Sequence, residues 1–231
     1  MAPDSPWTRE RASVQATRED KRESVLQAAA IAFARRGVDG TSMDDLAAMV
    51  GVTKPTIYRT VGDKEAIVRA CEARMVTQFR EALAQAKAVR GTGLQKTGHY
   101  LRLSLHLMVQ DVYCRLNLPF GGPDVYAGSS EDSSAMREEA QLQVRAWLRA
   151  DQRAGVMHQD VDTRLTALAL FAAFNFIPRW YREDGSQTLD EIFDATMRVF
   201  ECGLVVTTPI GLSGGKKTAK VLRSSSSLQG V

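Results

Sequence analysis

The chain has 231 residues, of which 44% are hydrophobic and 25% are charged. This length and composition are typical of a globular protein with one or two domains, and they exclude a chain that is disordered throughout. The formal net charge is only +3, so a surface that binds nucleic acid must be a local patch on a body that is not basic as a whole.

The cysteines and the apolar runs indicate the compartment. Cys71, Cys114 and Cys202 are odd in number and far apart, with no Cys-x-x-Cys pair, which argues against a disulfide framework and favours a reducing, cytoplasmic setting. The first twenty residues lack the apolar segment of a secretory signal. The most apolar run, residues 165–177, is shorter than the roughly 20 residues that span a bilayer, so we expect no membrane segment.

The N-terminal part of the chain predicts an arm followed by two helices. Residues 1–19, in which arginines and acidic residues nearly balance, are expected to form a flexible arm. Apolar residues at spacings of three and four then predict a helix over residues 20–36. A short helix follows, which Thr41 or Ser42 can cap and which stops at Gly51.

Two more helices follow directly. Thr53 is the expected N-cap of a second short helix, and Pro55 lies in its first turn, where a missing N–H costs little. Gly62 ends this helix, and Asp63 caps a much longer one that continues to about Val89.

The two short helices have the spacing of a helix-turn-helix. Ala47 is small where two helices cross, Gly51 permits a tight turn, and Ile57 packs back onto the first helix of the pair. This arrangement presents its second helix to the major groove of DNA.

The remainder of the chain is also predicted to be helical. A loop rich in Gly, Pro and Ser is expected at residues 117–132, and a low-complexity, disordered tail at residues 207–231. The helices are predicted at residues 94–116, 133–154, 162–181 and 188–206. We therefore predict an all-α fold, with a three-helix DNA-binding domain at residues 20–66 and a larger helical domain at residues 67–206.

The N-terminal motif resembles a known family. TSMDDLAAMVGVTKPTIYRTVGDKEAIV, residues 41–68, resembles the DNA-binding domain of the TetR (tetracycline-repressor) family, and RESVLQAAAIAFARRGVDG ahead of it is similar to that family's first helix. The resemblance implies a homodimer with an N-terminal helix-turn-helix domain and a larger C-terminal ligand-binding and dimerisation domain. It also implies a repressor that leaves double-stranded operator DNA when a small-molecule effector binds.

The same resemblance assigns DNA contacts to particular residues. Tyr58 and Lys64 match a tyrosine and a lysine that bind backbone phosphate in the family, and the start of the second short helix faces the groove. One departure is that Thr60 and Val61 stand where the family has an aromatic pair, so we expect a weakened phosphate contact there. The candidates are Thr41, Ser42, Thr53, Lys54, Pro55, Thr56, Tyr58, Arg59, Thr60 and Lys64.

The last two helices are expected to form the dimer interface. They are more apolar than one core requires, and their alanines allow helices to approach closely. The alternative is that the aromatic residues are simply core. The candidates are Ala169, Ala172, Phe176, Phe193, Met197 and Phe200.

A ligand pocket is expected among the helices at 94–116, 133–154 and 162–181. Its candidate lining residues are His99, Leu103, His106, Gln110, Tyr113, Trp147 and Phe174. Polar groups on a largely apolar helix can orient a ligand, although the histidines can equally be satisfied in the core or at the surface. The ending FNFIPRWYREDG, residues 174–185, resembles actinobacterial TetR-type regulators of lipid or steroid catabolism, which implies a lipophilic or acyl-coenzyme A effector.

An enzyme is not expected. GLSGGKK, residues 211–217, fails as a phosphate-binding loop because three residues rather than four separate its outer glycines. The histidines form no His-Glu-x-x-His pattern and no nucleophile elbow is present, so we predict no catalytic residues, no cofactor and no metal. Two alternatives to a repressor stay open: an activator with the same domains, and a ligand- or partner-binding helical dimer whose DNA-binding unit is vestigial.

Overall fold

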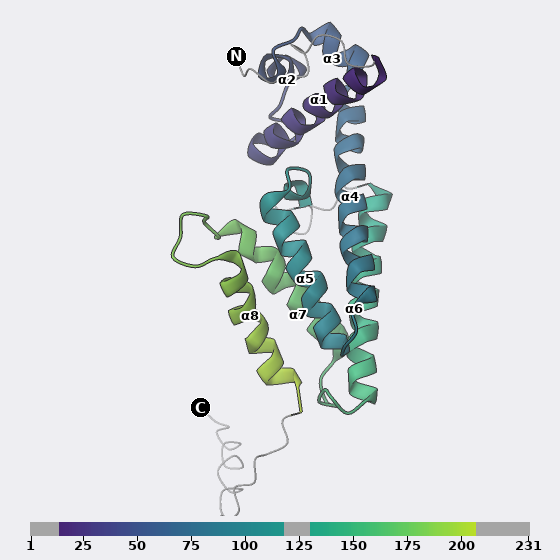
Figure 1. Ribbon diagram of the computed structural model, residues 1–231, viewed down its shortest axis with the longest axis vertical. Coiled ribbons are helices and arrows are strands. Elements are labelled where there is room, and N and C mark those ends of the chain that lie inside the picture. Colours follow the sequence, from purple (N-terminus) through teal and green to yellow (C-terminus); the bar gives the residue numbers. More distant parts are fainter. Residues whose placement is uncertain (1–13, 118–129, 207–231) are drawn as a thin grey trace, which may run out of the picture.

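The computed structural model describes residues 14–117 and 130–206. Within these ranges it contains eight α-helices, short 3-10 segments and no β-sheet (Figure 1), which confirms the predicted all-α fold. Figure 1 shows α1, α2 and α3 together at one end of the molecule and the remaining helices extending away from them. Most of the predicted arm, most of the predicted loop and the predicted tail lie outside the described residues.

The first helix, α1 (Val14–Arg36), begins six residues earlier than the sequence pattern predicted. Residues 14–19 are therefore helical, and the prediction that they belong to a flexible arm is wrong. The physical reason is a tertiary contact, since the guanidinium of Arg74 lies 3.7 Å from the carboxylate of Glu19 and 2.5 Å from that of Glu23. These ion pairs dock the beginning of α1 on a later helix.

Side-chain and glycine caps define the short helices α2 (Met43–Val50) and α3 (Lys54–Val61). Oγ of Ser42 accepts a hydrogen bond from the Asp45 N–H at 3.1 Å, and the Asp45 carboxylate accepts one from the Ser42 N–H at 2.9 Å. This reciprocal capping box satisfies two backbone donors at the start of α2. Gly51 ends α2 with a φ of 76°, a left-handed conformation that glycine adopts without strain.

The core of this small unit agrees with the helix-turn-helix reading. Leu46, Ala47 and Ile57 are buried where α2 and α3 pack on each other and on α1. Val61, which replaces an aromatic residue of the family pattern, is buried as well. The prediction that Ala47 and Ile57 form the crossing of the two short helices is therefore confirmed.

The long helix α4 (Lys64–Ala88) belongs to both parts of the molecule. Oδ1 of Asp63 accepts a hydrogen bond from the Ala66 N–H at 2.7 Å and caps it, as predicted. Its first half packs on α1, where Sγ of Cys71 donates to the carbonyl oxygen of Leu26 at 3.6 Å. Its second half runs beside α5 and α6 (Figure 1).

The next helix, α5 (Gly93–Gln110), is held at both ends by carboxylates. Asp151 is buried and accepts hydrogen bonds from the backbone N–H groups of Gly93 and Leu94, both at 2.7 Å. At the other end, Asp111 is extended and its Oδ1 accepts from the N–H groups of Tyr113 and Cys114. This cap starts a 3-10 turn, so the predicted helix over 94–116 is wrong in its last part.

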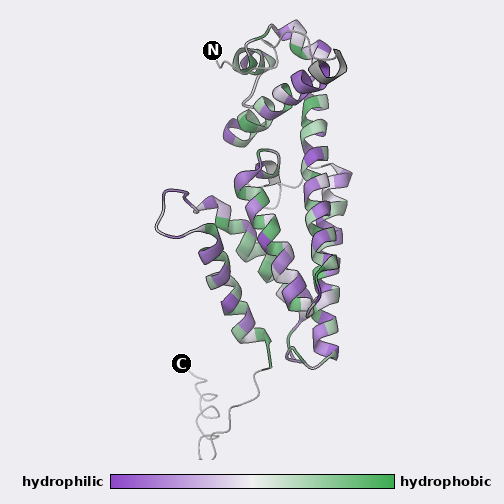
Figure 2. Ribbon diagram, viewed as in Figure 1, coloured by the Kyte–Doolittle hydropathy of each residue, from purple (hydrophilic) through white to green (hydrophobic). Residues whose placement is uncertain are grey.

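The larger unit is completed by α6 (Glu131–Arg153), α7 (Thr163–Phe176) and α8 (Leu189–Leu204). The chain tightens into a 3-10 turn at Ile177–Arg179, which contains Pro178, so α7 ends earlier than predicted. Figure 2 shows hydrophobic and hydrophilic residues interspersed along each helix, as expected for amphipathic helices around a shared core.

Candidate nucleic-acid interface and effector site

The helix α3 presents a polar, cationic face to solvent. Ile57 and Val61 point into the core, while Thr53, Lys54, Pro55 and Arg59 are exposed and Tyr58 retains 47% of its accessible surface. The alternation follows from the 3.6-residue period of a helix. Residues proposed for DNA contact therefore share the outer face of α3, and Lys64 is partly exposed at the first turn of α4.

The ammonium of Lys54 is already paired. Nζ of Lys54 lies 2.9 Å from Oδ2 of Asp44, which is on α2. The hydrogen bond to Asp44 raises the pKa of Lys54 above its ordinary value, so this group keeps its positive charge. The sequence does not predict this contact, because it depends on how α2 and α3 cross.

Of the two predicted phosphate contacts at the start of α2, the one by the side chain of Thr41 needs correction. Thr41 is 1% exposed and its hydroxyl donates to the Gly37 carbonyl at 2.9 Å, so its side chain is not available to DNA. Ser42 is exposed, but its hydroxyl donates to Asp45 at 2.8 Å while it caps the helix. These bonds to the backbone and side chain of Ser42 hold the pKa of Asp45 below its ordinary value.

The threonines of α3 bind one another or their own helix. The hydroxyls of Thr53 and Thr56 lie 2.9 Å apart, and the hydroxyl of Thr60 donates to the Thr56 carbonyl at 2.7 Å. Thr53 occupies the N-cap position as predicted, although its side chain makes no capping bond. The hydroxyl of Thr60 is therefore engaged by its own helix.

Among the described residues, the seven predicted ligand-binding residues are not brought together around one cavity. His106 is on the side of α5 that faces α8, where its Nε2 lies 3.2 Å from Oδ1 of Asp190, and Gln110 is exposed. Phe174 is buried with its ring centroid 4.8 Å from that of Phe193. The remaining four are Tyr113 at the junction described below, buried Trp147, and the partly exposed His99 and Leu103.

A small, partly open cavity lies on the neighbouring face of α5. Its volume is about 50 Å³, and its lining comes from α4, α5, α6 and α7, including Phe79, Tyr100, Ser104, Phe171 and Asn175. The sequence signal for this cavity is the four-residue spacing of Tyr100 and Ser104. These residues follow directly after the predicted pair, His99 and Leu103. Burial raises the pKa of Tyr100 to about 12, so the phenol stays neutral.

One polar group of this cavity has no hydrogen-bond partner in the part of the chain that the structure describes. Ser104 is 5% exposed, and its hydroxyl makes no hydrogen bond within the described residues. The phenol of Tyr100 lies close to it, but the geometry does not meet the requirements of a hydrogen bond. Because an unpaired buried hydroxyl is costly, this atom is suited to bind a ligand group.

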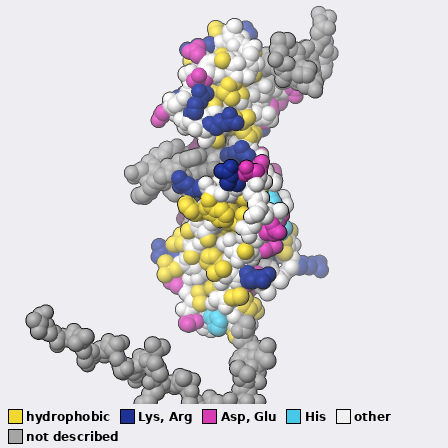
Figure 3. Space-filling model, turned by 90° about the vertical axis from the view of Figure 1, so that its left-hand side faces the viewer, with side chains coloured by type: hydrophobic (Ala, Val, Ile, Leu, Met, Phe, Trp, Pro, Cys, Tyr) yellow, Lys and Arg dark blue, Asp and Glu magenta, His cyan; other side chains and the backbone are white. Residues whose placement is uncertain are grey.

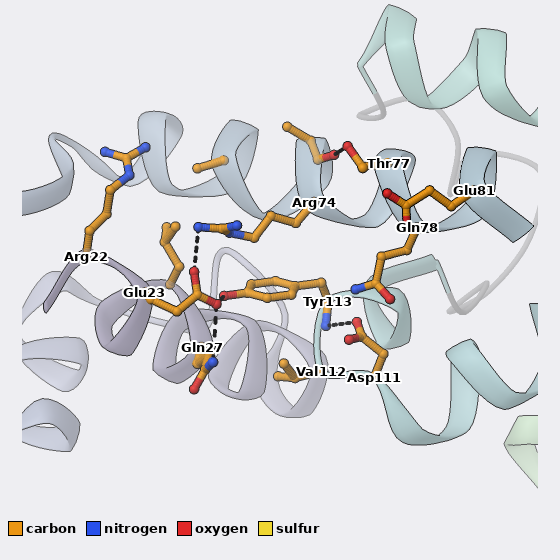
Figure 4. A pocket seen from close by; sticks show the side chains of 13 residues that line it. Arg22, Glu23, Gln27, Arg74, Thr77, Gln78, Glu81, Asp111, Val112 and Tyr113 are labelled. Carbon is orange, nitrogen blue, oxygen red and sulfur yellow. Dashed lines mark hydrogen bonds and ion pairs between the residues drawn. The ribbon is translucent and has the colours of Figure 1, made fainter. Parts of the chain in front are cut away.

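A larger groove, of about 610 Å³, lies at the junction of the two units between α1, α4 and the end of α5 (Figure 4). The hydroxyl of Tyr113 donates to Oε1 of Glu23 at 2.6 Å, and the other carboxylate oxygen pairs with Arg74. Burial and the bond to Glu23 both raise the pKa of Tyr113 well above its ordinary value. Tyr113 therefore connects the end of α5 to the DNA-binding unit.

Three of the predicted dimer-interface residues are on an exposed face. Ala169, Ala172 and Phe176 follow Leu165 on the outer side of α7, and Phe176 is 57% exposed. Figure 3 shows hydrophobic side chains gathered over the larger unit on the face that carries α8. The exposed apolar stripe of α8 consists of Ala195, Val199 and Cys202, at intervals of four and three.

Two of the other three interface candidates need revision. Phe193 and Met197 are buried within the chain itself, because α8 packs this side against α5 and α7. Phe200 is only partly exposed. For Phe193 and Met197 the alternative reading, that the aromatic and apolar residues of this helix are core, is the one the structure supports.

Family models match both parts of the chain. Residues 25–71 match the model described as bacterial regulatory proteins of the tetR family, and residues 127–204 match a tetracyclin repressor-like C-terminal domain. No curated protein sequence gives a significant match. Within the described residues, no helix combines the length and apolar character that crossing a bilayer requires.

Solved structures share the fold. The ketosteroid transcriptional regulator KstR2 of Mycobacterium tuberculosis is 18% identical, with a TM-score of 0.70 over 81% of this chain and 96% of its own. AibR in complex with isovaleryl coenzyme A and operator DNA is 19% identical, with a TM-score of 0.67 over 78% and 97%. A TetR family member from Streptomyces coelicolor A3 is 29% identical, with a TM-score of 0.62 over 79% and 91%. The chain belongs to the TetR family of bacterial transcriptional regulators.

Proposed function

We propose that this protein is a transcriptional repressor that binds operator DNA as a homodimer and is released by a small, lipophilic or acyl-coenzyme A-like effector. The observation that carries the proposal is the outer face of α3, where Lys54, Tyr58 and Arg59 project from a helix whose inner face is fixed by Ile57. A cationic, hydrogen-bonding helix of this length suits the major groove.

The dimer is proposed to form through α7 and α8. Exposed apolar residues recur at intervals of four, three and four on α7, from Leu165 to Phe176, and at intervals of four and three on α8, from Ala195 to Cys202. Large exposed apolar patches mark interaction sites, and a two-fold dimer brings the same two helices of each copy together as four. Two DNA-binding units in one particle then match two half-sites in the operator.

The effector is proposed to enter the cavity beside Tyr100 and Ser104. The volume of about 50 Å³ is far below the roughly 300–1,000 Å³ of ligand pockets, so binding requires α5, α6 and α7 to separate. The complex of AibR with isovaleryl coenzyme A supports an acyl-coenzyme A class of effector, and the likeness to KstR2 supports a lipophilic one. Movement of α5 would reach α1 through Tyr113 and Glu23.

The test begins with selection of bound sequences from a random pool of double-stranded oligonucleotides. The wild-type chain is expected to enrich one sequence, and Tyr58→Ala combined with Lys64→Ala is expected to weaken binding to it strongly. Loss of the Lys64 phosphate contact should also flatten the dependence of log affinity on log salt concentration by about 0.9. The matched control is Tyr181→Ala combined with Lys96→Ala in the larger unit, which should bind like the wild type.

Two results would contradict this proposal. Unchanged operator binding by the Tyr58 and Lys64 double variant would reject the assigned contacts. Failure of the wild-type chain to enrich any sequence would reject operator binding itself and favour a helical dimer with a vestigial DNA-binding unit. The effector class is tested separately, by release of the bound DNA on addition of isovaleryl coenzyme A, with free coenzyme A as the control.

A further inference from the structure

An ion pair joins the first turns of the two helices of the helix-turn-helix. Lys54 is the first residue of α3, and Asp44 is the second residue of α2; their charged atoms lie 2.9 Å apart. Both side chains are substantially exposed, at 45% for Lys54 and 71% for Asp44. Exposed ion pairs contribute little to stability, so stability alone does not account for this contact.

The two neighbouring carboxylates of α2 have different partners. Asp45 closes the capping box with Ser42 and lies 3.7 Å from Arg36. Asp44 takes no part in the capping box and binds Lys54 across the turn between the helices. Asp44 is therefore the acidic group that faces the recognition helix.

The charge of Asp44 bears on how Lys54 meets DNA. A lysine ammonium is a flexible point charge, and near a duplex it binds the nearest phosphate, which carries no sequence information. An ammonium has three N–H donors, so one can remain on Asp44 while the others reach base acceptors such as N7 and O6 of guanine. The carboxylate of Asp44 also repels phosphate from the place where Lys54 is held.

We propose that Asp44 is a positioning residue for sequence readout, which holds the ammonium of Lys54 toward base edges of the major groove and opposes its capture by a backbone phosphate. The inference rests on the proposed operator binding, and it assigns to Asp44 the selectivity of the contact that Lys54 makes with the operator. The partner is a base pair with guanine acceptors in the operator half-site.

The experiment compares binding to the selected operator with binding to a scrambled duplex of the same composition, at three salt concentrations. Asp44→Asn is expected to bind the scrambled duplex more tightly than the wild type, because a charge that repels phosphate is gone and Lys54 is released. The salt dependence should steepen by up to about 0.9 in log–log slope as Lys54 gains a phosphate. The ratio of operator to scrambled affinity should fall on the order of tenfold.

Three further variants separate positioning from general effects of charge. Asp39→Asn removes the same charge from the turn between α1 and α2 without touching Lys54, and it should leave the affinity ratio unchanged. Asp44→Glu retains the carboxylate and should restore most of the ratio. In a Lys54→Gln background, Asp44→Asn should have little additional effect on the ratio, because Asp44 acts through Lys54.

The outcomes distinguish this inference from the proposed function. If the wild type selects an operator and Asp44→Asn keeps the full affinity ratio, the inference is wrong while operator binding stands. An equal loss of ratio in Asp39→Asn, or an additive loss in the double variant with Lys54→Gln, would also overturn it. If the wild type selects no sequence, both are rejected. Melting temperatures equal to that of the wild type show that the exposed substitutions leave the fold intact.

Discussion

The two units of this chain are stabilised by contacts of different range. In the DNA-binding unit, polar side chains bind partners close in sequence, such as Ser42 and Asp45 three residues apart and Lys54 and Asp44 ten residues apart. The larger unit has local caps of the same kind, such as Thr188 with Glu191, but it adds long-range bonds: Asp151 binds the N–H of Gly93 at a separation of 58 residues. A short segment therefore specifies the first unit almost alone, whereas the second depends on the packing of the whole chain.

The largest expected effect tests the long-range side of this comparison. Asp151→Ala leaves the buried N–H groups of Gly93 and Leu94 without their acceptor, and each such group is costly. We expect a loss of about 3 kcal/mol in the free energy of unfolding, measured by urea denaturation followed by circular dichroism. Glu138→Ala, an exposed change on the same helix, is the control and should lie within about 0.5 kcal/mol of the wild type. Equal losses in the two variants would contradict the role of Asp151.

The next effect tests the contact between the units. Tyr113→Phe removes the hydrogen bond to the Glu23 carboxylate and should cost about 1.5 kcal/mol. Because Glu23 is on α1, we expect faster amide hydrogen exchange in α1, with little change in α7. Tyr181→Phe is the control, since this tyrosine lies outside the junction. Unaltered exchange in α1 would show that Tyr113 does not connect the units.

A smaller loss of stability is expected when a local contact in the DNA-binding unit is removed. Ser42→Ala removes the capping side chain of α2, which should cost about 1 kcal/mol. The change should appear in hydrogen exchange of α2 and α3 and not in the larger unit, because the contact is local. Ser186→Ala, in the loop before α8, is the control. Destabilisation that spreads evenly over the chain would break the distinction between local and long-range stabilisation.

The smallest effect concerns pH. Hydrogen bonds from His106 and Arg102 lower the pKa of Asp190 from its ordinary value of 3.8. A carboxyl with a lowered folded-state pKa contributes stability above pH 3.8, and the contribution is lost as pH falls through the lower folded-state value. Asp190→Asn should therefore reduce the melting temperature slightly at pH 6 and progressively less toward pH 3. Asp160→Asn is the control, and a difference that stays constant over this pH range would contradict the linkage.

The sequence predicted the positions of residues best where the contacts are between residues close together in the chain. Ala47, Gly51 and Ile57 could be placed because a helix-turn-helix depends on residues within about three turns of helix. The sequence did not show in the same way which face of α5 lines the cavity. Its side chains meet other helices on several sides, and a shift of one residue rotates a helix position by about 100°. His99 and Leu103 were predicted to line the pocket, whereas Tyr100 and Ser104 line the cavity in the structure.

The predictions of helix ends and of interface faces in the larger unit were limited by the same dependence on contacts between distant parts of the chain. The end of α5 is set by the Asp111 carboxylate, which binds the N–H groups of Tyr113 and Cys114, a feature that hydrophobic periodicity does not report. On α8, two stripes are apolar. Only packing against α5 and α7 decides that Phe193 is inside and Val199 outside.

The length of α4 gives the molecule a mechanical property. A helix of 25 residues is about 37 Å long; its second half packs on α5 and α6, and its first half packs on α1 of the DNA-binding unit. A tilt of about 5° at one end displaces the other by about 3 Å. In a two-fold dimer the displacements oppose each other, so the separation of the recognition helices changes by about 6 Å against a groove repeat of about 34 Å. A small tilt of α4 can therefore change the spacing of the two recognition helices so that it no longer matches the major grooves, without any unfolding.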